Sequence, residues 1–315
     1  MAESACGEVV VLPCRSSILQ MGRWHLSLMQ RIPSLQIQHD VLFDPTGYPN
    51  AWGNHPFEAI LVHDLSMFEP GLYRPGKRTW FQWFYKRALH KARLCICVSE
   101  HTRSQLLDRF DLPPKRCVVV PNSLDKTFAL APEGNPHPGN PSGPYLLVVG
   151  TIETRKNLQR VLTAFAAAEL PHQLVLAGRL GSGGEALIAQ AKTLGKRVII
   201  LHDLDDRQLR HLYRGATGLV FASSEEGFGL PILEAMQSGI PVLTSKVSAM
   251  PEIAGDAALL VDPTSIRAIR DGIVRLATDQ ELSGTLVAKG RLRLPEFEPR
   301  RNAERLLSHL RAQTP

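Results

Sequence analysis

No apolar run in the 315-residue chain approaches the roughly 18 to 20 residues that a membrane-spanning helix requires. Residues 1–13 lack both the basic start and the apolar stretch of a secretory signal peptide. No internal repeat of the length used by solenoid proteins is present. These absences argue against a membrane-spanning protein and a repeat array, and they predict a cytoplasmic protein.

Cysteine is also scarce. The five cysteines are odd in number and lie mostly in apolar, strand-like surroundings, so we expect reduced core thiols rather than disulfides. Cys95 and Cys97 have the wrong spacing for a zinc-binding pair, and a strand would direct both side chains to one face. Buried thiols are therefore favoured over a metal site.

Short apolar runs bounded by polar residues, glycine or proline recur along the chain and are typical of strands buried on both faces of a parallel sheet. Between the later runs lie helical patterns, such as Leu158, Val161, Leu162 and Phe165. This alternation predicts an α/β protein. The predicted strands are 9–13, 40–44, 59–64, 94–99, 117–122, 145–150, 173–178, 198–203, 218–223, 241–245 and 257–262.

Proline, glycine and asparagine are so dense in residues 131–144 that neither helix nor strand can persist there. We place a domain boundary in this segment, with an N-terminal domain of residues 1–130 and a C-terminal domain of residues 143–297. Pro295 and Pro299 interrupt any continuous helix near the end of the second domain. The helical pattern that follows, within 298–315, is expected to return to the first domain.

The segment 223–236 (SSEEGFGLPILEAM) follows a predicted strand, passes through two glycines and opens a helix at Pro231. Unpaired N–H groups at a helix start, together with the helix dipole, form an anion site. Glu226 and Glu234 would flank this site and accept hydrogen bonds from sugar hydroxyls. The alternative is that the helix dipole and a tight turn alone account for these acids and glycines.

A second segment, residues 150–157 (GTIETRKN), also follows a strand and opens a helix. Arg155 and Lys156 oppose the helix dipole there, so their positions are unfavourable unless an anion lies nearby. This pattern predicts phosphate ligands, with arginine able to bind two oxygens at once. The alternative is a solvated basic loop.

Together these motifs resemble the retaining glycosyltransferases of family 4, which have the GT-B fold. The resemblance rests on Gly150-Thr151-x-x-x-Arg155-Lys156-Asn157 and on Glu226-x7-Glu234 with Gly227-Phe228-Gly229-Leu230-Pro231 inside it. Supporting matches occur in family order across nearly the whole chain, at residues 62–65, 98–103, 120–122, 251–253 and 260–263.

The resemblance implies two Rossmann-like domains facing a cleft, retention of the sugar's configuration, and no metal or other cofactor. Arg155 and Lys156 would hold the donor diphosphate, beside Gly150 and Thr151. Glu226 and the backbone of Gly227, Phe228, Gly229 and Leu230 would contact the transferred sugar. Glu234 would bind the ribose, and the base would lie near Leu204.

The N-terminal half departs from the family pattern. Gly22 and Arg23 resemble the first glycine loop, where one glycine replaces a common pair, and the chain between them and Asp40 is short. We therefore expect a shortened N-terminal domain, with Gly22 and Arg23 on the acceptor side. His63 ends a predicted strand and would lie near the sugar or the acceptor, although histidines at such positions also serve structural roles.

Residues 74–93 interleave basic and aromatic side chains, and the whole chain has a net charge of +6. Such a segment suits peripheral binding to an anionic membrane surface, here the inner face of the plasma membrane, and would favour a lipid-linked acceptor. The alternative is a helix with one aromatic face in the core and a solvated basic face.

The predicted function is transfer of a hexose from a nucleotide sugar to a lipid-linked saccharide or polysaccharide in the synthesis of cell-surface polysaccharide or lipopolysaccharide. The motif type favours mannose from GDP-mannose. The alternative from another class is a catalytically silent nucleotide-sugar-binding subunit of a glycosyltransferase complex. A two-carboxylate hydrolase and a metal-binding triplet at 203–205 are weaker interpretations. No nucleic-acid-binding module is recognisable.

Overall fold

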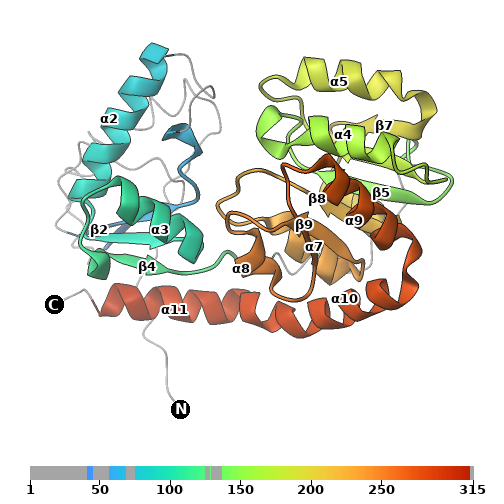
Figure 1. The fold of residues 1–315 in the computed structure, drawn as a ribbon. Coiled ribbons are helices and arrows are strands. Elements are labelled where there is room, and N and C mark those ends of the chain that lie inside the picture. The colour runs from blue at the N-terminus through green and yellow to red at the C-terminus, as the bar shows by residue number, and fades with distance from the viewer. Residues whose placement is uncertain (1–40, 45–56, 69–74, 125–127, 129–136, 313–315) are drawn as a thin grey trace.

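The structure is a computed structural model that describes residues 41–44, 57–68, 75–124, 128 and 137–312. Within this part, the chain forms two parallel β-sheets in two lobes, with helices packed against each sheet (Figure 1). The predicted α/β architecture is therefore correct. The predicted strand at 9–13 and the residues Gly22 and Arg23 lie outside the described residues.

The N-terminal sheet has the order β1-β2-β3-β4 with all neighbours parallel. Its strands are β1 (Leu42–Asp44), β2 (Glu58–Val62), β3 (Leu94–Cys97) and β4 (Cys117–Val119). Every side chain of β3 is buried, as expected for an apolar strand covered on both faces. Helices α2 (Pro75–Lys91) and α3 (Glu100–Arg109) cover one face through Tyr85, Leu89 and Leu106.

Cys95, Cys97 and Cys117 are free, buried thiols on the sheet face that carries α2 and α3. Cys95 and Cys97 share that face, as the strand period predicts. A hydrogen bond with Cys117 and burial raise the pKa of Cys95, and burial raises the pKa of Cys97. These two thiols are packing groups of the core.

The C-terminal sheet has the order β10-β9-β8-β5-β6-β7, again with all neighbours parallel. Its strands are β5 (Tyr145–Val149), β6 (Gln173–Ala177), β7 (Val198–Leu201), β8 (Gly218–Phe221), β9 (Val242–Ser245) and β10 (Leu259–Val261). From β5, the chain first extends the sheet through β6 and β7, then returns to place β8 on the other side of β5. The strand order therefore reverses between β5 and β8, and ligands of doubly wound sheets bind at such a reversal.

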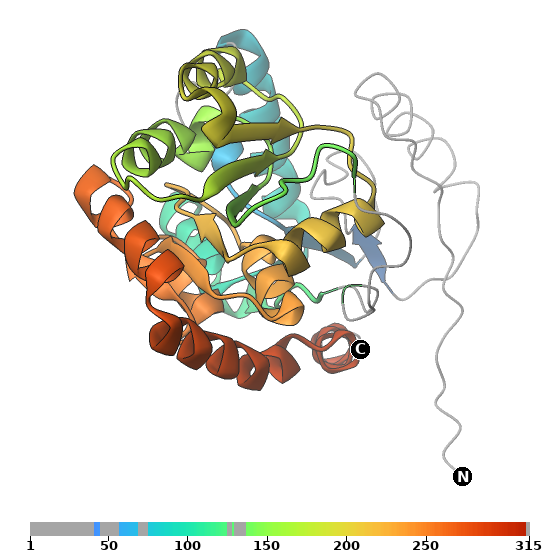
Figure 2. The same ribbon diagram turned by 90° about the vertical axis from the view of Figure 1, so that its right-hand side faces the viewer.

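Helices cover both faces of the C-terminal sheet (Figure 2). One face packs against α4 (Leu158–Ala166), α5 (Gly184–Thr193), α9 (Ile266–Thr278) and α10 (Gln280–Arg293). The other packs against α6 (Asp206–Gly215), α7 (Leu230–Ser238) and α8 (Met250–Ala254). The spacing of Leu158, Val161, Leu162 and Phe165 indeed places all four in the core.

After α10, a short 3-10 helix at Leu294–Phe297 leads into α11 (Pro299–Arg311), so the two prolines do interrupt the helix. Figure 1 shows α10 and α11 running from the C-terminal lobe to the N-terminal lobe. Leu306 and Leu310 pack against the N-terminal sheet on the face opposite α2 and α3, and Asn302 Nδ2 donates to Ser123 Oγ at 3.0 Å. The last helix thus joins the core of the first lobe.

Candidate active site

The two predicted donor motifs meet at the reversal of strand order. Residues 150–157 follow β5 and residues 222–229 follow β8, and these strands are paired neighbours. Asn157, in a left-handed conformation with φ 58°, ties the loops together because its Nδ2 donates to Ala222 O at 2.9 Å and to Pro263 O at 2.7 Å. The topology therefore explains why motifs about 70 residues apart form one site.

Arg155 and Lys156 converge on the carboxylate of Glu226. Arg155 Nη1 lies 3.0 Å from Glu226 Oε2, and Lys156 Nζ lies 2.6 Å from Glu226 Oε1. The three side chains are 19%, 13% and 9% exposed, so solvent screens these ion pairs less than pairs on the open surface. Both cations are held in place by the residue that was predicted to contact the sugar.

Further partners fix Arg155. Its Nη2 lies 3.0 Å from Glu153 Oε1, and its Nη1 also donates to Glu225 O at 2.8 Å. Burial lowers the pKa of Arg155, but the charges of Glu226 and Glu153 outweigh burial and raise it. The anion that the sequence required beside these cations is supplied here by the protein's own carboxylates.

Ser248 holds the backbone of Glu226. Glu226 N donates to Ser248 Oγ at 2.9 Å, and that hydroxyl donates to Glu226 O at 2.6 Å. Ser248 follows β9, the next strand beyond β8. Sequence reasoning missed Ser248, although its place after the neighbouring strand could have indicated it.

The helix start at α7 is shaped by a glycine and a proline. Gly229 has φ 104°, a conformation that residues with a Cβ rarely adopt, and Pro231 lies in the first turn. Phe228 is buried edge-to-face against Phe297, with ring centroids 5.9 Å apart. Leu230 is the partly exposed first residue of the helix. The glycine and the buried ring fix the direction of the helix start.

Gly227 lies where the two lobes touch. A Cβ at this position would be 1.8 Å from His63 O, so any side chain would push the lobes apart. Its carbonyl accepts hydrogen bonds from Ser99 Oγ at 2.6 Å and from Thr102 Oγ1 at 3.0 Å. His63, exposed after β2, is thereby brought to the loop that carries Glu226.

Glu252 adds a second contact between the lobes. Its two carboxylate oxygens accept from Glu100 N at 2.9 Å and His101 N at 3.2 Å, which caps α3 from the other lobe. Beside it, His101 Nε2 lies 2.7 Å from Glu225 Oε1. The helix start of α3 is therefore bound to the loop after β8 and to α8.

Glu234 lies one turn into α7, and its Oε2 accepts a 2.5 Å hydrogen bond from Tyr213 OH on α6. Leu204, in the loop between β7 and α6, packs against the core cluster that contains Tyr213. Asp205 caps α6 and forms a capping box with Gln208, so this acid of the 203–205 triplet serves the start of a helix. Tyr213 was not predicted from the sequence.

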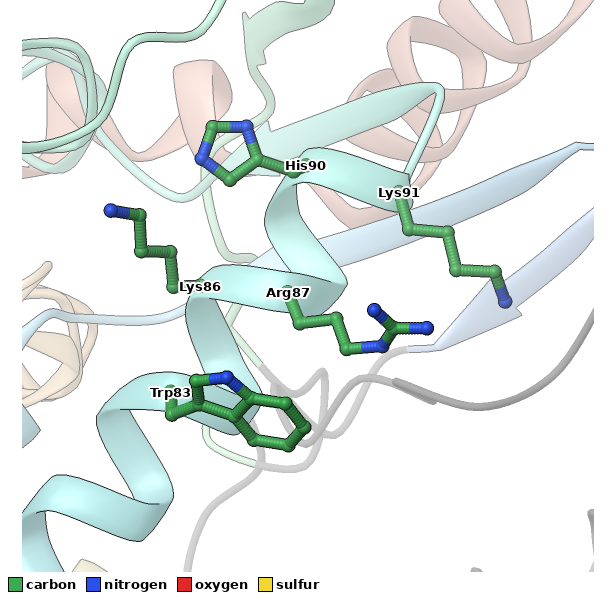
Figure 3. Close-up of a pocket in the computed structure, with 5 residues that line it drawn as sticks. All are labelled: Trp83, Lys86, Arg87, His90 and Lys91. Carbon is green, nitrogen blue, oxygen red and sulfur yellow. The ribbon is translucent and has the colours of Figure 1, made fainter.

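A separate hollow lies on the exposed side of α2. Trp83, Lys86, Arg87, His90 and Lys91 line this cavity of about 620 Å³. Figure 3 shows all five side chains projecting from the last turns of the helix. Trp83 is 53% exposed, while Phe84 and Tyr85 are buried. The buried aromatics beside exposed basic side chains fit a helix that packs one face in the core, while membrane binding by segment 74–93 stays a prediction.

Comparison with known proteins identifies the family of the chain. Residues 134–293 match the family Glycosyl transferases group 1, and residues 11–128 match Glycosyltransferase Family 4. The chain is 30% identical over 273 residues to O-antigen chain mannosyltransferase B of Escherichia coli, with 79% of this chain and 69% of that protein covered. It is 25% identical over 213 residues to O-antigen chain mannosyltransferase RfbU of Salmonella typhimurium, with 65% of this chain and 57% of that protein covered.

Solved structures share the fold. Sucrose-phosphate synthase from Thermosynechococcus elongatus superimposes with a TM-score of 0.73 at 21% identity, covering 97% of this chain and 81% of that one. Anabaena HepE in complex with UDP and glucose gives a TM-score of 0.72 at 16% identity, covering 95% and 84%. With the family matches on both halves, these results show that the chain belongs to glycosyltransferase family 4 and has the GT-B fold.

Proposed function

We propose that this glycosyltransferase transfers mannose, with retention, from GDP-mannose to a lipid-linked saccharide or polysaccharide during the synthesis of a cell-surface polysaccharide. The carrying observation is the cluster of Arg155, Lys156 and Glu226 beside the start of α7. The choice of sugar and pathway is supported by relatives named O-antigen chain mannosyltransferases.

In the proposed reaction, the bond between the sugar's anomeric carbon and the diphosphate breaks as the acceptor oxygen forms a new bond on the same face. The acceptor's proton passes to the departing phosphate. Negative charge grows on that diphosphate, so Arg155, Lys156 and the N–H groups of α7 would stabilise the transition state. Two fixed cations can serve the leaving group in place of a metal ion, so we propose a metal-independent reaction.

A donor screen tests this function. The purified protein is incubated with UDP-, GDP- and dTDP-sugars and membrane-derived acceptors, with and without EDTA, and nucleotide release is measured. We expect GDP release from GDP-mannose, unchanged by EDTA. Binding of a nucleoside diphosphate without turnover of any donor would instead support the silent-subunit alternative. Preference for another donor would refute the assignment of mannose.

We also propose that the hollow on α2 contacts anionic lipid. An exposed indole next to lysine, arginine and histidine side chains matches the boundary between lipid headgroups and acyl chains. Among the described residues, no helix combines the length and apolar character needed to span a bilayer. Contact through α2 would place the enzyme beside a lipid-linked acceptor.

Vesicle flotation tests this contact. Phosphatidylglycerol-containing vesicles should carry the protein with them, whereas pure phosphatidylcholine vesicles should not. The variant Lys86→Ser/His90→Ser should bind more weakly, while Arg300→Ser, an exposed change on α11, should behave like the wild type. Equal binding to both vesicle types would refute the proposal.

A further inference from the structure

The hydrogen bond between Tyr213 and Glu234 joins two helices of the C-terminal lobe. Tyr213 on α6 is fully buried, and its hydroxyl donates to Glu234 Oε2 on α7 at 2.5 Å. The phenol ring is held edge-to-face by Phe128, with ring centroids 5.8 Å apart at an interplanar angle of 75°. The hydroxyl therefore has a fixed position from which to orient the carboxylate.

Glu234 can still accept a hydrogen bond from a ligand through one of its carboxylate oxygens. Its Oε2 is bonded to Tyr213, while its Oε1 has no hydrogen-bond partner among the residues that the structure describes. The side chain is half-buried, so Oε1 is not sealed in the core. Burial raises the pKa of Glu234 and the negative charge of Asp206 adds to that effect, whereas the Tyr213 hydrogen bond lowers the pKa. The phenol thus favours the ionised carboxylate, which can only accept hydrogen bonds.

We infer that Tyr213 is a positioning residue that orients Glu234 toward a ribose hydroxyl, and thereby makes the site prefer ribonucleotides over deoxyribonucleotides. The inference rests on the proposed function, because it assumes that a nucleotide-sugar donor binds at α7. It adds a preference for ribonucleotides over deoxyribonucleotides. This preference depends on Tyr213, a buried side chain that does not itself touch the ligand. A carboxylate built to accept from a hydroxyl is left unpaired when a ligand lacks that hydroxyl.

The test compares nucleotides that differ by one hydroxyl. Calorimetry gives dissociation constants for GDP and UDP, and for the 2′-deoxy and 3′-deoxy forms of whichever binds more tightly. We expect the wild type to prefer the ribonucleotide by about tenfold over at least one deoxy form. Tyr213→Phe should lower this preference about three- to fivefold, mainly by weakening ribonucleotide binding.

Tyr145→Phe is the matched control. Tyr145 is another buried phenol of the same core cluster, and its hydroxyl donates to Leu212 O at 2.7 Å rather than to a carboxylate. This variant should keep the wild-type ratio of ribonucleotide to deoxyribonucleotide affinity. A purely structural role for Tyr213 would make both variants weaken both ligands equally.

The outcomes separate the two hypotheses. If the wild type binds neither GDP nor UDP, the proposed function fails. If it binds them without a ribose preference, or if Tyr213→Phe retains the full preference, the positioning role is wrong. Should Tyr213→Phe not fold, Phe128→Leu takes its place, because it keeps the phenol and loosens its ring; an unchanged ratio in that variant would equally contradict the inference.

Discussion

The carboxylate of Glu226 lies between two cations, Arg155 and Lys156. A carboxylate expected to face a sugar is bonded through both oxygens to Arg155 and Lys156. It keeps these cations in place, and under the proposed function it would compete with the donor diphosphate for them. Its removal should lower sugar transfer without weakening binding of the product nucleotide.

At the residue scale, we predict that Glu226→Ala lowers kcat/KM for sugar transfer at least about a hundredfold. A loss of this size is expected when a catalytic contact is removed. Affinity for GDP should be unchanged or higher, because two cations lose an internal counter-charge. Arg155→Ala should weaken both affinity and transfer. Steady-state kinetics and calorimetry measure these effects, with Glu185→Ala, an exposed acid on α5, as the control. Wild-type transfer in the Glu226 and Arg155 variants would refute the site assignment.

The grouping of Arg155, Lys156 and Glu226 could be predicted because each follows an apolar strand, and strand ends meet at one edge of a parallel sheet. Ser248 and Tyr213 could not be identified in the same way. Tyr213 has the spacing of an ordinary core aromatic on α6, and its partner Glu234 lies on another helix. Such a pairing depends on how two helices pack, which no local pattern records.

At the scale of elements, the start of α7 depends on Gly229. A Cβ there would be 3.2 Å from Ile232 Cδ1 and would have to adopt φ 104°. We predict that Gly229→Ala lowers the free energy of unfolding by about 1–3 kcal/mol. Donor binding should also weaken, because the helix start shifts.

Gly284→Ala provides the matched control. Gly284 lies within α10 with nothing within 4 Å of an added Cβ, so alanine there should raise the free energy of unfolding by about 0.5–1 kcal/mol. Urea unfolding measures both variants. If Gly229→Ala is as stable as the wild type, the backbone at α7 is not restricted as described.

At the scale of the whole molecule, the lobes meet where the start of α3 contacts the loop after β8 and α8. We predict that Glu252→Ala leaves the amides of Glu100 and His101 without their acceptor, so that both exchange hydrogen about tenfold faster. Amide exchange measured by mass spectrometry or NMR checks this result, with Glu281→Ala, a change at an exposed residue of α10, as the control. Unchanged exchange at the start of α3 would show that the lobes are not joined there.

The sequence motifs indicated both lobes but not this junction. Residues 98–103 and 251–253 matched the family pattern without any sign that they touch, and the structure joins Glu252 to the start of α3. The limits 1–130 and 143–297 stay predictions, while the two sheets draw on residues 42–119 and 145–261. Contacts between lobes depend on how two folded units dock, which strand and helix periodicity does not encode.

The path of α11 sets the order in which the protein can be completed on the ribosome. The apolar face that receives Leu306 and Leu310 belongs to strands made early, but its covering helix is translated after the whole C-terminal lobe. At ordinary translation rates the delay is on the order of ten seconds or longer. During that interval the described strands of the N-terminal sheet lack the contacts of Leu306 and Leu310, so the final packing of this face has to wait for the second lobe.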